Sequence, residues 1–170
     1  MNSNVKLYSL SLRDVRTYAF AALFIVGNIV FPQLCHALMP KGGLIFLPIY
    51  FFTLIGAYKY GAKVGLLTAL LSPIINSAFF GMPPVSALPM IVMKGVLLAC
   101  AASVIANRTK SVSILALLVV VLMYQVVGCG IEWAVKGSFM AGVQDFRLGV
   151  PGMLIQVIGG WAFIKFILKK

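Results

Sequence analysis

The chain has 170 residues, of which 62% are hydrophobic and 10% are charged. Soluble domains carry about 25% charged residues, so this composition excludes an ordinary soluble protein and indicates a single membrane domain over residues 1–170. The net charge of +11 does not indicate nucleic-acid binding. The basic residues are scattered in short loops between apolar runs and form no patch with interleaved aromatic residues.

The first apolar run, residues 15–31, follows Lys6 and Arg13 and has Arg16 at its start, as the apolar part of a signal peptide would. The sequence after it, PQLCH, contains no pair of small residues suited to cleavage. We therefore expect this run to be retained as the first membrane helix.

Six apolar runs approach the length of about 20 residues that crosses a bilayer. They cover residues 15–31, 43–57, 62–80, 87–106, 112–133 and 150–168. They are too long for the strands of a membrane barrel and do not alternate in polarity. The sequence thus predicts an all-α membrane protein with six transmembrane helices embedded in the lipid bilayer.

Lysines and arginines are concentrated in the loops on the cytoplasmic side of membrane proteins. If the N-terminus is cytoplasmic, only Lys41, Lys136 and Arg147 fall outside, and Lys94 lies within the membrane. The inner side then holds Lys6, Arg13, Arg16, Lys59, Lys63, Arg108, Lys110, Lys165, Lys169 and Lys170. This asymmetry predicts that both termini are cytoplasmic.

Lys94 is the first candidate site residue, because apolar residues flank it on both sides of the fourth run. At 1.5 Å per residue it lies about 10 Å from the outer start of that run. A lysine near the centre of a membrane helix costs roughly 2.5–3.5 kcal/mol on insertion scales. It normally faces the protein interior, a partner or a wet cavity, so its position predicts a binding site.

Other strongly polar residues also fall in the outer half of the membrane. Gln125 is expected about 12 Å deep, Gln156 about 9 Å, and Asn28 and Asn76 about 5–6 Å. Gln125, Gly128, Cys129 and Glu132 lie three or four residues apart, so they form one stripe on the fifth helix. We expect Lys94, Gln125, Glu132, Gln156, Asn76 and His36 to contribute to a substrate site.

Two loops on the outer side are candidate lids. One, residues 35–43, contains Met39 and Lys41, and its glycines can act as a hinge. The other, residues 81–86, contains Met82 and Pro83. Glu132 and Gln125 are expected to bracket the pocket, with Gly128 leaving room beside the backbone. Glu132 can also pair with Lys94 if their two helices are neighbours.

Structural alternatives remain open for these residues. Asn28, Asn76 and Gln156 are also suited to hydrogen bonds between helices. Lys94 is compatible with a structural ion pair to Glu132 or with a side chain that extends to the membrane surface. His36 is compatible with a loop residue at a wet interface, and a single histidine does not make a metal site.

The pattern of polar residues favours binding over catalysis or autonomous transport. A secondary transporter requires polar groups near the midplane and is often built from inverted repeats, and the sequence shows no repeat. The only acids are Asp14, Glu132 and Asp145, and no HExxH or GxSxG motif is present. We therefore expect no catalytic residues and no metal site. A standalone small-solute permease and a structural subunit of a membrane complex are the alternatives.

Residues 42–95 carry a family resemblance. A short second helix is followed by GAYKYGAKVGLLTALLSP, by the turn GMPP and by a helix with a polar residue. This arrangement resembles the substrate-binding membrane subunit, or S-component, of energy-coupling factor (ECF) vitamin transporters. The length, six spans and basic C-terminus are similar as well.

The resemblance implies a subunit in a bacterial cytoplasmic membrane that captures a vitamin or its precursor from outside. It implies partners, namely a transmembrane coupling subunit and two cytoplasmic ATPases that use ATP, and no cofactor on this chain. The family's AxxxA coupling contact on the first helix is matched most nearly by Thr17 with Ala21 and by Tyr18 with Ala22.

The solute class follows only weakly from the charges near the mouth of the site. Lys94 together with Lys41 or Arg147 favours a carboxylate. If Glu132 neutralises Lys94, a neutral or cationic heterocycle becomes the alternative.

Overall fold

The computed structural model describes residues 6–39 and 42–168, which form helices and connecting loops and contain no strand. The helices are α1 (Val15–Leu38), α2 (Gly42–Phe46), η1 (Pro48–Tyr50), α3 (Phe51–Tyr60), α4 (Ala62–Phe80), α5 (Leu88–Thr109), α6 (Ile114–Lys136), α7 (Phe139–Gly142), α8 (Gln144–Leu148), α9 (Val150–Leu154), η2 (Ile155–Gly159), α10 (Gly160–Ala162) and η3 (Phe163–Ile167). The last four are consecutive and make one helical stretch, Val150–Ile167. The all-helical prediction is confirmed.

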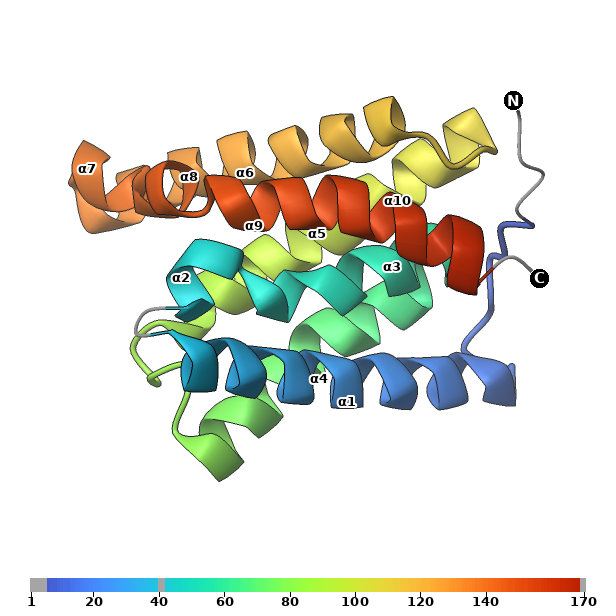
Figure 1. Ribbon diagram of the computed structural model, residues 1–170, viewed down its shortest axis with the longest axis horizontal. Coiled ribbons are helices and arrows are strands. Elements are labelled where there is room, and N and C mark those ends of the chain that lie inside the picture. The colour runs from blue at the N-terminus through green and yellow to red at the C-terminus, as the bar shows by residue number, and fades with distance from the viewer. Residues whose placement is uncertain (1–5, 40–41, 169–170) are drawn as a thin grey trace.

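Five helices in the described part of the chain are long and apolar enough to cross a membrane: α1, α4, α5, α6 and the stretch Val150–Ile167. They form a bundle in which the chain runs back and forth (Figure 1). The start of α1 and the end of η3 lie at one end of this bundle, whereas α2, α7 and α8 lie at the other. The protein is therefore a multi-pass membrane protein by its architecture.

The second predicted span, residues 43–57, is not one helix. Helix α2 ends at Phe46, Leu47 adopts a left-handed conformation with φ of 46°, and a 3-10 turn precedes α3. Leu47 stands before Pro48, and a residue before proline is disfavoured in the right-handed helical region because its backbone clashes with the proline ring. The break in this segment thus has a local cause.

Helix α3 forms the centre of the molecule. Nine of its ten residues are buried, and it contacts α1, α4 and α5. The contact with α4 is close, because a Cβ atom added at Gly65 would lie 2.4 Å from the Cβ of Ala57. Small residues at such a crossing allow helix backbones to approach. Helix α3 is therefore enclosed by its neighbours.

A buried polar network joins α1 to α3 and α4. The Asn28 amide donates to the hydroxyls of Thr53, at 3.0 Å, and Ser72, at 3.1 Å, and its carbonyl accepts the backbone N–H of Phe52 at 3.1 Å. That N–H lies in the first turn of α3, where backbone donors lack a partner within the helix. Asn28 thus completes the entry into α3 after the break.

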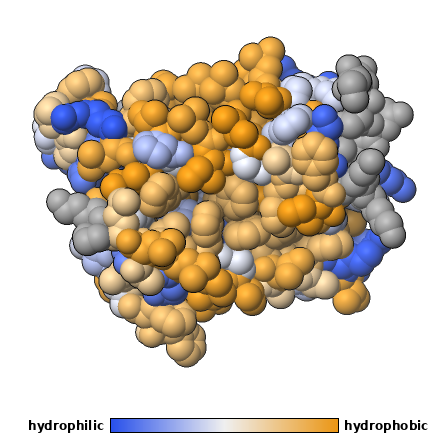
Figure 2. Space-filling view, in the orientation of Figure 1, coloured by the Kyte–Doolittle hydropathy of each residue, from blue (hydrophilic) through white to orange (hydrophobic). Residues whose placement is uncertain are grey.

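The outer surface is that of a protein surrounded by lipid. Figure 2 shows hydrophobic residues over most of the middle of one face, with hydrophilic residues gathered toward its two ends. Leucine, valine and phenylalanine side chains are exposed along α1, α6 and the last helical stretch. An apolar band between polar ends is what a bilayer solvates.

Candidate functional site

Four charged side chains meet at the end of the bundle that holds α2, α7 and α8. Lys94 on α5 donates from Nζ to Glu132 Oε2 on α6 at 2.5 Å and to Asp145 Oδ2 on α8 at 2.6 Å. Lys136, one turn after Glu132, donates to its Oε1 at 2.5 Å. The ion pair between Lys94 and Glu132 that the sequence offered as an alternative is therefore present.

The cluster runs from a buried to an exposed end. The side chain of Lys94 is 1% exposed and that of Glu132 is 8%, whereas Asp145 is 20% and Lys136 is 44% exposed. A buried charge is tolerated only when paired and hydrogen-bonded, because leaving water costs several kcal/mol per ion. The pairing with two carboxylates explains how Lys94 can lie inside the protein.

Gly128 explains how Lys94 fits beside α6. It lies one turn before Glu132, on the same face of the helix, and a Cβ atom there would come within 2.8 Å of Lys94 Cγ and 3.2 Å of its Cε. Because Gly128 has no side chain, the aliphatic part of Lys94 can pack directly against α6. Two members of the predicted stripe, Gly128 and Glu132, thus lie against Lys94.

A cavity of about 240 Å³ borders the charged cluster, which we call the charged cavity. All four charged side chains line it, together with residues of α2, η1 and the start of α5. Tyr50 also lines it, and its hydroxyl is buried without a hydrogen-bond partner among the described residues. A polar group in this condition costs free energy unless it gains a partner.

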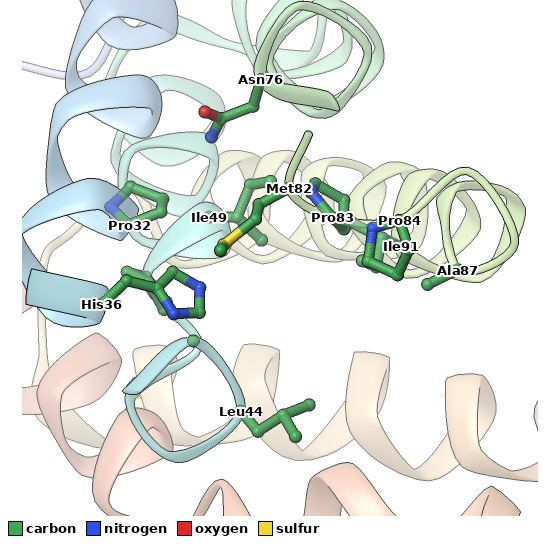
Figure 3. A pocket seen from close by; sticks show the side chains of 12 residues that line it. Pro32, His36, Leu44, Ile49, Asn76, Met82, Pro83, Pro84, Ala87 and Ile91 are labelled. Carbon is green, nitrogen blue, oxygen red and sulfur yellow. The ribbon is translucent and has the colours of Figure 1, made fainter. Parts of the chain in front are cut away.

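A second cavity of about 320 Å³ adjoins the first, and we call it the apolar cavity (Figure 3). Proline, methionine, isoleucine and leucine side chains make most of its wall, and Met82 extends toward His36. The two cavities share five wall residues: Gly43, Leu44, Ile49, Ala87 and Ile91. An elongated molecule with one polar end would match the pair.

The predicted site residues divide among these features. Lys94 and Glu132 line the charged cavity. The apolar cavity takes His36, Asn76, Met82 and Pro83. Met39 is exposed and lines neither cavity, and Lys41 lies outside the described residues.

Asn76 is held by protein groups as well as facing the apolar cavity. Its amide nitrogen donates to the backbone carbonyl of Asn28 at 3.1 Å, and its Oδ1 accepts from the side-chain amide of Gln33 at 3.1 Å. The alternative of hydrogen bonds between helices is therefore confirmed for Asn28 and Asn76.

Gln125 and Gln156 line neither of the two cavities, although both were expected to contribute to the substrate site. Both are fully buried. Gln156 Oε1 accepts a hydrogen bond from the Tyr124 hydroxyl at 3.0 Å, whereas both amide atoms of Gln125 lack a partner in the described part of the chain. They lie within the packed core, because their helix faces turn toward neighbouring helices and away from the cavities.

Asp145, Lys136 and Tyr50 belong to the site and were not predicted. Asp145 is one of three acids in the chain, and Lys136 stands four residues after Glu132, where ion pairs form along a helix. These signals were available in the sequence. Tyr50 had no comparable indication in the sequence. Its position depends on the 3-10 turn between α2 and α3, and the sequence predicted one continuous helix there.

The predicted coupling residues on α1 have different exposures. Thr17 is fully buried and its hydroxyl donates to the Ser11 carbonyl at 2.6 Å, and Ala21 is buried too. Ala22 is exposed, as is Tyr18. Thr17 and Ala21 therefore face the interior of this chain, and the outward pair at that spacing is Tyr18 with Ala22.

The arrangement provides binding chemistry. Charged groups and a tyrosine hydroxyl offer ionic and hydrogen-bond contacts, and the apolar cavity offers a surface for a ring or chain. In the described residues no three histidine, cysteine, aspartate or glutamate side chains are grouped to hold a metal. Comparisons with protein-family models, with curated proteins and with solved structures gave no match.

Proposed function

We propose that this chain is the substrate-capture subunit, or S-component, of an ECF-type importer in a bacterial cytoplasmic membrane. The observation that carries the proposal is the pair of adjoining cavities with a buried charged cluster at the end away from the start of α1 and the end of η3. The lysine and arginine bias orients that end toward the outside. In this orientation the broken second segment, α2 to α3, serves as the sixth crossing.

The dimensions of the site support capture of a small solute. Ligand sites usually occupy about 300–1,000 Å³ and are mostly apolar, with a few polar groups that fix orientation. Residues of α2, of the loop between α4 and α5 and of the short helix α8 line the cavities. Short connecting segments of this kind open more readily than long packed helices.

Release on the inner side requires partners in this proposal. Below the charged cluster the core is filled by side chains such as Leu54, Ile55 and Leu117. These residues line neither cavity, whereas a self-sufficient transporter needs a path to both sides of the membrane. Delivery would therefore depend on a transmembrane coupling subunit and two ATPases that hydrolyse ATP, while this chain performs no catalysis.

One observation favours a second candidate, a structural subunit of a membrane complex. Lys94 already has two carboxylate partners within the chain, so its burial does not by itself require a ligand. The two candidates differ in whether the cavities bind a solute.

The test is a thermal-shift screen of the purified, detergent-solubilised protein against vitamins and their precursors. A ligand at 1,000 times its dissociation constant stabilises its protein by about 4 kcal/mol, so one compound should stand out. Ile91 lies in the wall that the two cavities share. The larger side chain of Ile91→Trp would fill part of both cavities and should abolish the shift. Leu122→Trp, on the exposed face of α6, is the matched control and should retain it.

The opposite result is equally informative. If the folded protein shows no shift with any compound, the capture function is wrong and the structural candidate is favoured. A shift that persists in Ile91→Trp would place the ligand outside these cavities.

A further inference from the structure

Asp145 is held much less firmly than Glu132, although both carboxylates bind Lys94. Glu132 lies on the long helix α6 and also binds Lys136. Asp145 lies on the five-residue helix α8, and its side chain has Lys94 as its single partner among the described residues. It is also the more exposed of the two. Asp145 is therefore the carboxylate that another group can replace.

Charge balance favours replacement by an anion. The cluster contains two ammonium groups and two carboxylates, so its formal charge is zero. An additional charge would remain unpaired near a buried lysine, where charges interact strongly. If a ligand carboxylate takes the position of Asp145, Lys94 keeps two acceptors and the charge at the buried end does not change. Asp145 is then free to move into water.

The surroundings of this position suit a carboxylate with an apolar body. The buried Tyr50 hydroxyl lines the same cavity and has no partner in the described chain, so it is available to donate to the second carboxylate oxygen. The apolar cavity adjoins through a shared wall. A molecule that bridges the two would have an anionic end and an uncharged end.

We propose that the ligand is an amphipathic carboxylate. Without the ligand, Asp145 occupies the position beside Lys94 that the carboxylate group of the ligand takes when it binds. The ligand's apolar part lies in the apolar cavity, and its entry releases α8 from α5. This inference rests on the proposed capture function for the presence of a ligand. The exchange at Lys94 is a property of the cluster and can be tested without knowing that ligand.

The first test is chemical rescue of Asp145→Ala with acetate, which reproduces the deleted group. The full chain in detergent is heated with 200 mM sodium acetate, with 200 mM acetamide plus sodium chloride, or with sodium chloride alone. Of these three conditions, we expect acetate to raise the denaturation midpoint of Asp145→Ala by about 2 °C or more, because binding to the native state stabilises it. The other two conditions should not raise it. The wild type and the double variant Lys94→Met/Asp145→Ala should not respond. Equal effects of acetate and acetamide, or no effect of acetate, would overturn the exchange.

The second test measures, without any added anion, how firmly Asp145 holds α8 against α5. Cys129 on α6 is buried and lies beside Phe139, Val143 and Phe146 of the α7–α8 region. In a Cys35→Ala/Cys100→Ala background, Asp145→Asn should increase the rate of Cys129 alkylation by a maleimide at least about threefold. This variant retains side-chain volume, so it serves if Asp145→Ala does not fold.

Arg16→Gln is the matched control for the labelling test. It breaks an ion pair with Asp14 beside the start of α1, at the end of the bundle away from the charged cluster, and should leave the Cys129 rate unchanged. Equal rates in Asp145→Asn and the parent protein would contradict the idea that Asp145 holds α8 against α5.

The ligand class is then decided by the compound found in the vitamin screen. A carboxylate whose carboxamide fails to bind supports the proposal, and a cationic or uncharged ligand at the same cavities overturns it. Rescue by acetate combined with a screen that finds no ligand would mean that the capture function has failed while the carboxylate position on Lys94 stands.

Discussion

Lys94→Met should destabilise the protein markedly, because it removes the cation that two carboxylates share. Loss of one member of a buried pair costs about 3–5 kcal/mol. The lower end applies here, since Glu132 keeps Lys136 and Asp145 is 20% exposed. For a chain of this size about 1 kcal/mol corresponds to roughly 2–4 °C, so about 3 kcal/mol predicts a fall of about 6–12 °C.

The assay is thermal denaturation in detergent followed by intrinsic tryptophan fluorescence. The triple variant Lys94→Met/Glu132→Gln/Asp145→Asn removes the stranded carboxylates with little change in volume. It should recover most of the lost stability, because a neutral replacement of a buried ion pair is often tolerated. A wild-type midpoint for Lys94→Met, or a triple variant no more stable than the single one, would refute the reasoning.

Two further pairs of substitutions each compare a residue that makes a hydrogen-bonded or tightly packed contact with a residue that does not. Asn28→Leu should cost about 1–3 kcal/mol, because it leaves a backbone N–H of α3 without an acceptor. Gln125→Leu should change stability by less than about 1 kcal/mol, since the amide has no partner in the described chain to lose; equal losses in the two variants would contradict this. Gly65→Ala should cost about 1–3 kcal/mol, because its Cβ would collide with Ala57, whereas Gly130→Ala meets nothing within 4 Å and should be neutral or slightly stabilising. Thermal denaturation measures both pairs, and a stable Gly65→Ala protein would show that α3 and α4 can separate freely.

The long helices were predictable because each apolar run carries its own information. A run of about 20 apolar residues has to satisfy its backbone hydrogen bonds internally in lipid, and a helix does so. Residues 62–80 were predicted with the same bounds that α4 has. The first run was predicted to end before Pro32, yet α1 continues to Leu38 with that proline inside it.

The second predicted span, residues 43–57, is a case in which apolar composition predicted one continuous helix and the structure has a break. Its composition fits a membrane helix, but the enclosure of α3 by α1, α4 and α5 allows the chain to break at Leu47. Asn28 then supplies a hydrogen-bond acceptor to α3 from another helix. Such a break depends on partners that are distant in sequence.

The candidate site was predictable in the same uneven way. Periodicity on one helix brought Gly128 and Glu132 to the same face, and the cost of burying Lys94 indicated that it needs a partner. The second carboxylate partner of Lys94, Asp145, comes from a short helix with no periodic pattern to orient it. Gln125 shares the helix face of Glu132, but packing against neighbouring helices closes the space around it.

The sequence by itself therefore determined the membrane setting, the long helices and the presence of a charge that must be neutralised inside the protein. These follow from composition and from local periodicity, which act on each segment separately. The pairing of Lys94 with Asp145, the two adjoining cavities and the path of α3 were decided by the tertiary structure. Each requires segments far apart in the chain to meet, and the energy of such contacts depends on their three-dimensional arrangement.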